Sequence, residues 1–343
     1  MDWKDYQNKI NQLELITKQE IVDFVNDRYR DNYVVVYKRL GEDKSSVKVT
    51  KPEITPVSIN RTDQSVFLKD YMRQADKTIK IHPVFLDFSK DISQSKVGDV
   101  NLLYKKNHDN DRFRLRYIID MGNDHNNKFG LAVDYLNFLG TKNMSPAEKQ
   151  QEFYKLGSDL SVSCNSDRIQ ITLSGLQENF EASVILLEDI LKNATGDEEA
   201  LIDLKNNILK SRNDAKLNKR VILQRAMMNY ARYGDNSSFT NILTEDELKN
   251  VTSTDLLDII NNFTTYEHRL SYYGPEDLES VAYSLSDLHI DKFNLKDLPS
   301  KKEFMEKDLD DPIVYVLDYD MKQAEILMIS KGEQLNKEKY SKI

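Results

Sequence analysis

The residues that could do chemistry in this chain are few and scattered. Its 343 residues include one cysteine and five histidines, which are His82, His108, His125, His268 and His289. No two histidines stand four residues apart, so no helix would present two imidazoles to one metal ion. Each histidine is therefore expected to be an ordinary surface or loop residue. A single cysteine excludes an intrachain disulfide and a cysteine-based zinc site.

The remaining candidates for chemistry are also weak. The segment DMGNDH at 120–125 resembles a metal-binding loop in composition, but calcium loops need regularly spaced oxygens and a closing bidentate acid. A turn after a strand is the favoured interpretation there and at 318–320. Cys164 alternates with Leu160 and Val162, which predicts an inert thiol facing a core. The sequence has neither a GxGxxG nor a GxxxxGK[ST] phosphate-binding loop.

The strongest charge feature is a basic tract at 205–232, which carries eight basic residues and a single acid, Asp214. The eight are Lys205, Lys210, Arg212, Lys216, Lys219, Arg220, Arg225 and Arg232. A solvated helix face is the simpler interpretation. The alternative is a basic wall that holds an acidic substrate or a partner domain. Nucleic acid is disfavoured as the main partner, because the chain has a net charge of −9.

The composition indicates a folded, rather helical protein. Hydrophobic residues make up 39% and charged residues 31% of the chain, with only 11 Gly and 7 Pro. The length favours two domains, or one domain with parts of its neighbours. No run approaches 18 consecutive apolar residues, so no membrane span is predicted.

Two segments share one pattern of helix, strand and glycine. Residues 16–26 and 251–261 match in their apolar positions and share Thr17/Thr252, Asp23/Asp258 and Asn26/Asn261, and Thr17 with Glu20 three residues later forms a capping box. Each is followed by a Tyr-bearing strand, YVVVYKRLG ending at Gly41 and HRLSYYG ending at Gly274. The separation of about 235 residues favours an internal duplication of domain size.

Between these two endings the sequence predicts one complete α+β domain. Strands are expected at 84–88, 100–106, 113–122, 160–164 and 168–175, and helices at 128–139, 146–156, 179–192 and 198–233. The turn at 107–111 is interpreted as a hairpin. Hairpins with grouped helices predict a mainly antiparallel sheet with helices packed on one face.

The flanking segments divide the rest of the chain. Residues 1–45 are predicted to be the helix–strand end of a preceding domain, and 46–82 an extended linker containing Pro52 and Pro56. The alternative for that stretch is a long surface loop within one domain. The complete domain is assigned to 83–298. Residues 299–343, with two strand-like runs after Pro312, are expected to begin a following domain.

The order of motifs resembles the pitrilysin/insulinase-type zinc metallopeptidases. The similarity runs from FRLRYIIDMGNDH through LAVDYLNFLGTKNMSPAEKQQEFYKLGSDLSVSCNSDRIQITLSGLQENFEASVILLEDIL. Gly140-Thr141, Ser145, Glu148 and Leu156-Gly157 follow in the order expected of such a domain. The resemblance implies a fold of the LuxS/processing-peptidase type, in which an active copy carries the inverted zinc motif HxxEH on a helix.

This sequence departs from the family at the motif itself. Counted back from Gly140-Thr141, the HxxEH positions fall on 131–135, where Leu131 and Tyr135 replace both histidines and Asp134 the glutamate. The third ligand would fall near Lys210, and no Glu occurs between 199 and 245. The resemblance therefore implies a metal-free domain with no catalytic residue and no bound cofactor.

The resemblance also implies a role. In four-domain members of this family the third domain is a degenerate copy of the zinc-bearing first, and two halves close around a peptide. This chain resembles the non-catalytic half, which supplies chamber wall and peptide-binding surface. Its expected partners are an N-terminal zinc-bearing half, in the same polypeptide or a separate subunit, and the peptide substrate. The Arg/Tyr pair of the second half would belong to the following domain and is not Arg232-Tyr233.

Two alternatives stay open. A structural or partner-binding homologue without proteolysis, like the core subunits related to processing peptidases, fits the same features. An unrelated α+β binding module would be favoured if the repeat at 16–41 and 251–274 were absent from the structure. Members of the family occur in the cytosol, organelles and periplasm, and the resemblance leaves the cytoplasm and the periplasm equally open for this chain.

Overall fold

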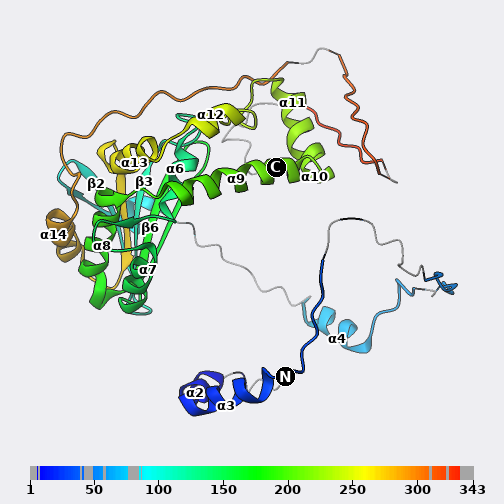
Figure 1. Cartoon of the computed structure of the whole chain (residues 1–343), viewed down its shortest axis with the longest axis horizontal. Coiled ribbons are helices and arrows are strands. Elements are labelled where there is room, and N and C mark those ends of the chain that lie inside the picture. The colour runs from blue at the N-terminus through cyan, green and yellow to red at the C-terminus, as the bar shows by residue number, and fades with distance from the viewer. Residues whose placement is uncertain are drawn as a thin grey trace. The chain divides into compact units, whose positions relative to one another are not determined.

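The computed structural model describes residues 6, 8–38, 41, 49–56, 59–75, 85, 87–308, 311–321 and 324–332 (Figure 1). The chain divides into two units, 1–82 and 83–343, which are described separately. His82, which the sequence marked as a loop histidine, lies outside the described residues.

Among its described residues, the first unit contains three helices: α2 (Lys9–Glu14), α3 (Lys18–Arg28) and α4 (Val66–Ala75). The capping box at the start of α3 is present, because the Thr17 hydroxyl accepts from the Glu20 backbone and Glu20 reaches back to Thr17. The strand expected next is not found within the described residues 33–38, whose side chains are exposed. An isolated strand leaves its backbone groups without partners, so it does not persist alone.

The predicted linker at 46–82 is not extended throughout. Residues 66–75 form helix α4, because Phe67 and Tyr71 stand four residues apart and stack with ring centroids 6.4 Å apart. The prolines at 52 and 56 lie upstream of this helix, where the described residues carry no regular element.

The second unit is built on a six-stranded sheet in the order β1-β2-β8-β3-β6-β5. Its strands are β1 (Ser93–Val97), β2 (Val100–Lys106), β3 (Arg112–Ile119), β5 (Asp159–Cys164), β6 (Ile169–Leu176) and β8 (Arg269–Gly274). Only the β2–β8 pair is parallel, and the other four pairs are antiparallel. A mainly antiparallel sheet is confirmed.

The predicted hairpin between β2 and β3 is wrong. Strand β8 lies between them, and Asn107 holds the intervening turn by donating its backbone N–H to the carbonyl of Gly274. The hairpin in this region is β1–β2, which turns at Gly98 with φ +61°. A side chain there would place its Cβ 2.3 Å from the Lys292 carbonyl oxygen. The strand predicted at 84–88 is also wrong at its end, since Phe88–Asp91 is helix α5.

Helices pack on one face of the sheet. The helices in contact with the sheet are α6 (Phe129–Leu136), α7 (Pro146–Lys155), α8 (Phe180–Asn193) and α14 (Leu278–Leu288), and α13 (Ser253–Asn262) packs on α6 and α8. Helices α9 (Glu198–Ala215), α10 (Lys219–Val221), α11 (Met228–Tyr233) and α12 (Glu245–Asn250) extend away from the sheet (Figure 1). A π-helical turn, η2 (Ile222–Met227), joins α10 to α11, and a small second sheet pairs β4 (Gly140–Thr141) with β7 (Ala194–Thr195). The described residues after 311 form no strand, so the two runs predicted there are not found.

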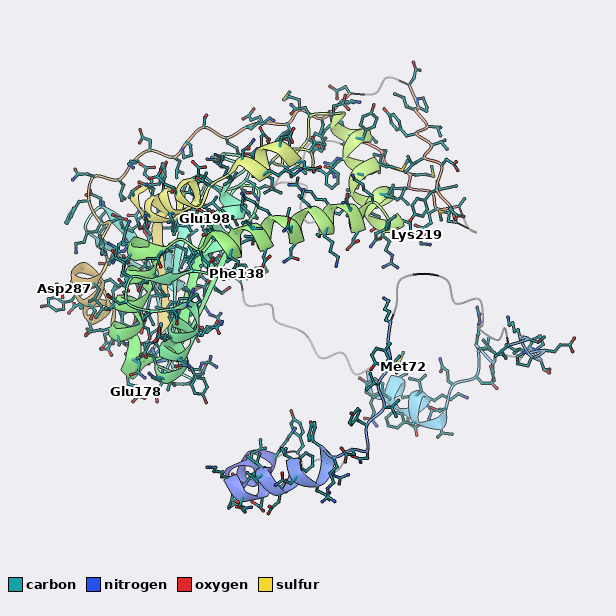
Figure 2. All side chains as sticks on the ribbon, in the orientation of Figure 1. Met72, Phe138, Glu178, Glu198, Lys219 and Asp287 are labelled. Atoms are coloured by element: carbon teal, nitrogen blue, oxygen red, sulfur yellow. The ribbon has the colours of Figure 1, made fainter. Side chains whose placement is uncertain are left out.

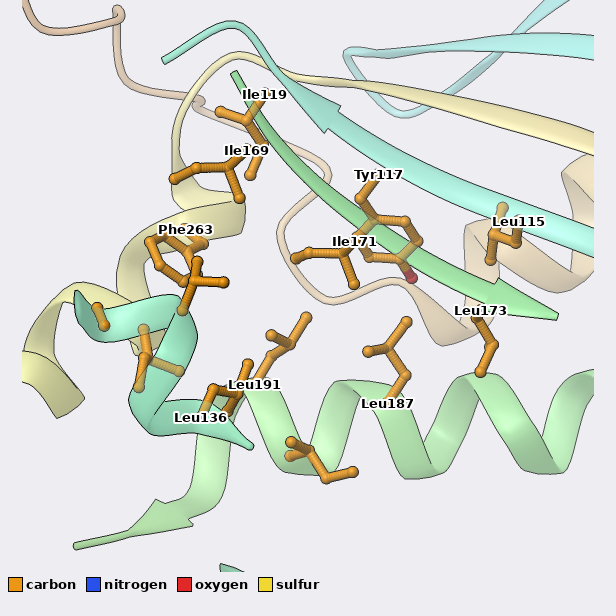
Figure 3. Packing of buried hydrophobic residues seen from close by; sticks show 14 of the residues in the cluster. Leu115, Tyr117, Ile119, Leu136, Ile169, Ile171, Leu173, Leu187, Leu191 and Phe263 are labelled. Carbon is orange, nitrogen blue, oxygen red and sulfur yellow. The ribbon is translucent and has the colours of Figure 1, made fainter. Parts of the chain in front are cut away.

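The core lies between the sheet and helices α6, α8 and α13. Along β3, Phe113, Leu115 and Tyr117 are buried while the residues between them are not, which is the alternation of a sheet covered on one face. Figure 3 shows Leu187 and Leu191 of α8 beneath Tyr117 and Ile171 of the sheet. The predicted α+β class with helices on one face is confirmed.

Candidate functional site

The positions that correspond to HxxEH lie on helix α6, which packs against strand β5 and helix α13. Leu131 and Tyr135, four residues apart, face the core and are 6% and 0% exposed. Asp134 points away from that core and is exposed. The side chains that replace the two zinc ligands are therefore internal packing groups.

Tyr135 is held by three polar contacts that join separate helices. Its phenolic oxygen accepts from the backbone N–H of Asp197 at 2.7 Å and lies 2.8 Å from the Asp197 carbonyl oxygen. It also lies 2.8 Å from the hydroxyl of Ser253. Asp197 caps α9 and Ser253 begins α13, so one side chain ties α6 to both helix starts. Gly196 permits this approach, since a Cβ there would lie 2.2 Å from the Ser253 hydroxyl oxygen.

These residues do not fit a zinc ion. Leu131 has no donor atom, and the Tyr135 oxygen is already saturated by its three partners. Lys210, at the position of the third ligand, is an exposed cation on α9. Within the described ranges, His, Cys, Asp and Glu form no group of three or more that could hold a metal ion.

Asp134 and Cys164 lie near each other where α6 meets β5. Partial burial raises the pKa of the Asp134 carboxyl. Burial raises the pKa of the Cys164 thiol to about 12, and the negative charge of Asp134 adds to this effect. The thiol is 3.6 Å from the amide oxygen of Asn123, to which it donates. A protonated, half-buried thiol is not a nucleophile, as the sequence pattern indicated.

A shallow pocket of about 570 Å³ lies beside the C-terminal end of α6. Its lining comes from β4, β7 and the starts of α7 and α9, and it includes Phe138 and Glu198, which are labelled in Figure 2. The helix starts are already capped, at α7 by Ser145 with Glu148 and at α9 by Asp197. Carboxylates therefore occupy the positions where an anionic ligand would bind.

The basic tract is not one continuous surface. Lys205 donates to the carbonyl oxygens of Lys249 at 3.0 Å and Val251 at 2.6 Å. Arg212 donates to the Leu243 carbonyl oxygen at 2.8 Å. These two side chains fasten α9 to the segment that contains α12.

Three more basic residues of the tract make contacts further along the chain. Lys219 pairs with Glu325 at 2.7 Å, and Arg232 pairs with Glu306. The Arg225 guanidinium lies 5.8 Å from the centroid of the Phe239 ring. The remaining three, Lys210, Lys216 and Arg220, are exposed.

Strand β5 offers an open sheet edge. In the part of the chain that the structure describes, β5 pairs with β6 alone. The backbone N–H of Asn165 donates to the carbonyl oxygen of Arg168. This bond fixes which residues of β5 point their backbone groups toward β6 and which point them away, because the two kinds alternate along an antiparallel pair. By that alternation, the backbone groups of Leu160, Val162 and Cys164 point away from β6. They are free to pair with another extended chain.

The sequence analysis did not predict the positions of two histidines and three arginines in the fold. His268 and His289 were expected at the surface, but they are 8% and 0% exposed and contact each other. Their sequence positions are isolated, so only the fold brings them together. Arg112, Arg114 and Arg116 lie on the face of the sheet opposite the helices. Their alternation in RFRLR was the available signal.

Residues 101–243 match the insulinase family, peptidase family M16. No curated protein matches the sequence. In the described residues, no helix combines the length and the apolar character needed to cross a bilayer.

Three solved structures have a similar fold. A peptidase M16 inactive domain from Pseudomonas fluorescens is 16% identical with a TM-score of 0.51, over 58% of this chain and 50% of that one. The periplasmic protease PqqL from Escherichia coli is 11% identical with a TM-score of 0.53, over 88% and 31%. The ferredoxin protease FusC, solved in complex with Arabidopsis ferredoxin, is 12% identical with a TM-score of 0.54, over 85% and 30%. The chain thus spans half or less of the length of these structures, and the likeness establishes the fold.

Proposed function

We propose, from the match of residues 101–243 to the insulinase family of peptidases, that the chain is a non-catalytic part of a zinc metalloendopeptidase. In this proposal it supplies chamber wall and peptide-binding surface opposite a zinc-bearing domain outside the chain. The peptide bond would be hydrolysed by a zinc-bound water in that other domain. This chain would bind and orient the substrate.

The observation that carries the proposal is the environment of Tyr135. A zinc site needs ligands that face an open cavity. Here the second ligand position is filled by a fully buried phenol that links α6 to Asp197 and Ser253. Asp134, in place of the general base, then has no metal-bound water to deprotonate.

The open edge of β5 supports the peptide-binding part of the proposal. An extended peptide that pairs with the outward backbone groups of Leu160, Val162 and Cys164 would continue the sheet by one strand. Its alternate side chains would lie beside Ser161 and Ser163, which are exposed and uncharged. Neither Lys nor Pro, the residues that commonly block sheet edges, occurs in β5.

The first experiment tests whether this chain alone binds zinc or hydrolyses peptides. Purified protein is assayed for zinc by elemental analysis and for cleavage of a broad peptide mixture, with and without added zinc. We expect neither stoichiometric zinc nor hydrolysis. Zinc at one equivalent, or hydrolysis abolished by a chelator, would show that the chain holds a metal site of its own.

The second experiment tests the binding role with a separately expressed segment that carries HxxEH. Peptide cleavage by that segment should require this chain. Val162→Pro removes one outward N–H from the β5 edge, and the control Val162→Ala keeps it. We expect KM to rise about fivefold for the proline variant relative to the alanine variant, the equivalent of one hydrogen bond.

A purely structural homologue is the second candidate. It is supported by the basic tract, in which five of eight side chains serve contacts within the chain. In that case the two Val162 variants would behave alike, and the HxxEH segment would gain stability from this chain without gaining activity.

A further inference from the structure

The face of the sheet opposite the helices carries a row of arginines on its central region. Arg112, Arg114 and Arg116 alternate along β3 with the buried residues Phe113 and Leu115. Successive side chains of a strand point to opposite faces, so the three arginines share the open face. Along one strand their spacing is about 7 Å.

The strands on either side offer these arginines no carboxylate. Arg114 lies across from Tyr273 in β8 and Ser174 in β6, and Arg116 lies across from Ser271 in β8 and a threonine in β6. Within the ranges that the structure describes, no carboxylate forms an ion pair with any of the three guanidinium groups.

Asp159 of β5 is the one acid of the neighbouring described strands on this face, and it stands across Ser174 from Arg114, one strand beyond β6. The acid that follows β3 is already engaged. Asp120 pairs with Arg168 at 3.0 Å and with Arg269, and the two arginines hold the pKa of its carboxyl below the usual range. It therefore does not neutralise the row on β3. Lys105 of β2, which lies across from Tyr273 of β8, adds another positive charge to the same face.

One atom of this row, the Nε of half-buried Arg116, lacks a hydrogen-bond partner in the described part of the chain. The Nε of Arg116 is inaccessible to solvent and has no hydrogen-bond partner among the described residues. A buried donor that lacks a partner costs free energy. Three like charges in a row also repel one another, and an anionic partner would relieve both costs.

The same face has apolar side chains between the charges. Leu103 and Ile118 are half-buried, and Tyr273 is 41% exposed. The surface is thus suited to a partner that combines carboxylates with apolar residues. A strand laid across a sheet face would leave its own backbone groups unpaired, whereas a helix satisfies them internally.

We propose that this open face, defined by Arg112, Arg114, Arg116, Lys105 and Tyr273, docks an acidic amphipathic helix of a partner protein or domain. Carboxylates at i and i+4 of a helix lie about 6 Å apart, close to the arginine spacing. The site is separate from the β5 edge and does not depend on peptide hydrolysis.

The test uses the full chain and a fluorescein-labelled synthetic helix with Glu at i, i+4 and i+7 and Leu on the adjoining positions. Binding is followed by fluorescence anisotropy. The Arg114→Glu/Arg116→Glu double variant should weaken binding at least about tenfold, because each charge-assisted contact is worth more than 1 kcal/mol. Raising the salt concentration should weaken binding by the wild-type protein.

The matched control reverses the same amount of charge elsewhere. Lys210→Glu/Arg220→Glu alters two exposed basic residues of α9 and α10 and should leave affinity unchanged. The milder Arg114→Gln/Arg116→Gln variant covers the case in which charge reversal disturbs folding, which unfolding curves detect. Val162→Pro should also leave affinity unchanged, which separates this surface from the peptide edge.

Three outcomes would overturn the proposal. Equal losses in the two double reversals would indicate long-range attraction without a site. If the protein bound a helix with Gln in place of Glu as tightly as the Glu helix, the carboxylates would not contribute to recognition. Tighter binding of a short duplex RNA than of the acidic helix, with loss in the same β3 variant, would assign the face to nucleic acid.

Discussion

Nε2 of His268 lies 2.9 Å from Nε2 of His289 in the core. Nδ1 of His268 lies 2.7 Å from the Tyr266 carbonyl oxygen, so Nδ1 carries the proton and Nε2 of a neutral His268 accepts from His289. Nδ1 of His289 is 2.7 Å from Glu188, which also accepts from the Tyr117 hydroxyl. Both ring nitrogens of His268 therefore have hydrogen-bond partners while the ring is neutral.

This arrangement predicts a loss of stability in acid. Burial lowers the pKa of His268 from 6.5 to about 4, so the unfolded chain takes up a proton first as the pH falls. The contribution of neutral His268 to the free energy of unfolding is complete above about pH 7. It is lost as the pH falls from the unfolded-state pKa to the folded-state pKa, and the total loss is about 3 kcal/mol. Urea unfolding should show a drop of about 2 kcal/mol from this histidine by pH 5. His268→Gln should flatten that part of the pH profile, and an unchanged profile would contradict the assignment.

The Tyr135 contacts predict a second effect on stability. Tyr135→Phe keeps the ring in the core and removes the hydroxyl, leaving the Asp197 N–H and the Ser253 hydroxyl without their partner. We expect a loss of about 1–3 kcal/mol in the free energy of unfolding. Tyr154→Phe, which alters a tyrosine that is 86% exposed, is the control and should change it by less than about 0.5 kcal/mol.

Lys149 predicts a third effect. Its ammonium donates to the carbonyl oxygens of Leu136 and Leu139 at the end of α6, and burial lowers its pKa. Lys149→Met leaves the Leu139 carbonyl oxygen without this donor, while the Leu136 carbonyl oxygen keeps the Leu139 backbone N–H, so we expect a loss of about 2 kcal/mol. Lys155→Met removes only the surface pair with Glu152 and should cost less than about 1 kcal/mol. Equal effects of the two substitutions would mean that the Lys149 contacts contribute nothing.

The basic tract offers a comparison between neighbours on one helix. Arg212→Ala removes the contact with the Leu243 carbonyl oxygen and should destabilise the protein by about 2 kcal/mol. Lys210→Ala, two residues away and exposed, should stay within about 0.5 kcal/mol. Thermal unfolding of the two variants side by side decides the point, and a larger effect at Lys210 would show that we misassigned the anchoring residue.

The helices were predictable because their signals are local. Ser145 with Glu148 and Thr252 with Asp255 are capping boxes that can be recognised within four residues, and both are present. The sheet order was not predictable, since β8 follows β3 by about 150 residues and a turn signal says nothing about what inserts beside it. Strand β1 was missed because SQSKV has one buried residue and almost no alternation.

The sequence predicted which residues occupy the motif positions, but it did not predict the contacts that they make. The positions of Leu131 and Tyr135 followed from the family pattern, and both are buried in the structure. The partners of Tyr135 lie 62 and 118 residues further along the chain, so only the fold reveals them. The internal duplication stays a prediction. The capping boxes before α3 and α13 agree with it, while the strand after α3 is absent from the described residues 33–38.

The position of β8 has a consequence for synthesis on the ribosome. Strands β2 and β3 emerge early, but neither can pair with β8, which lies between them, until residues 269–274 have left the exit tunnel. Until then the edges of β2 and β3 that β8 later covers are unpaired. Nascent chains released before Gly274 should therefore need a chaperone to stay soluble.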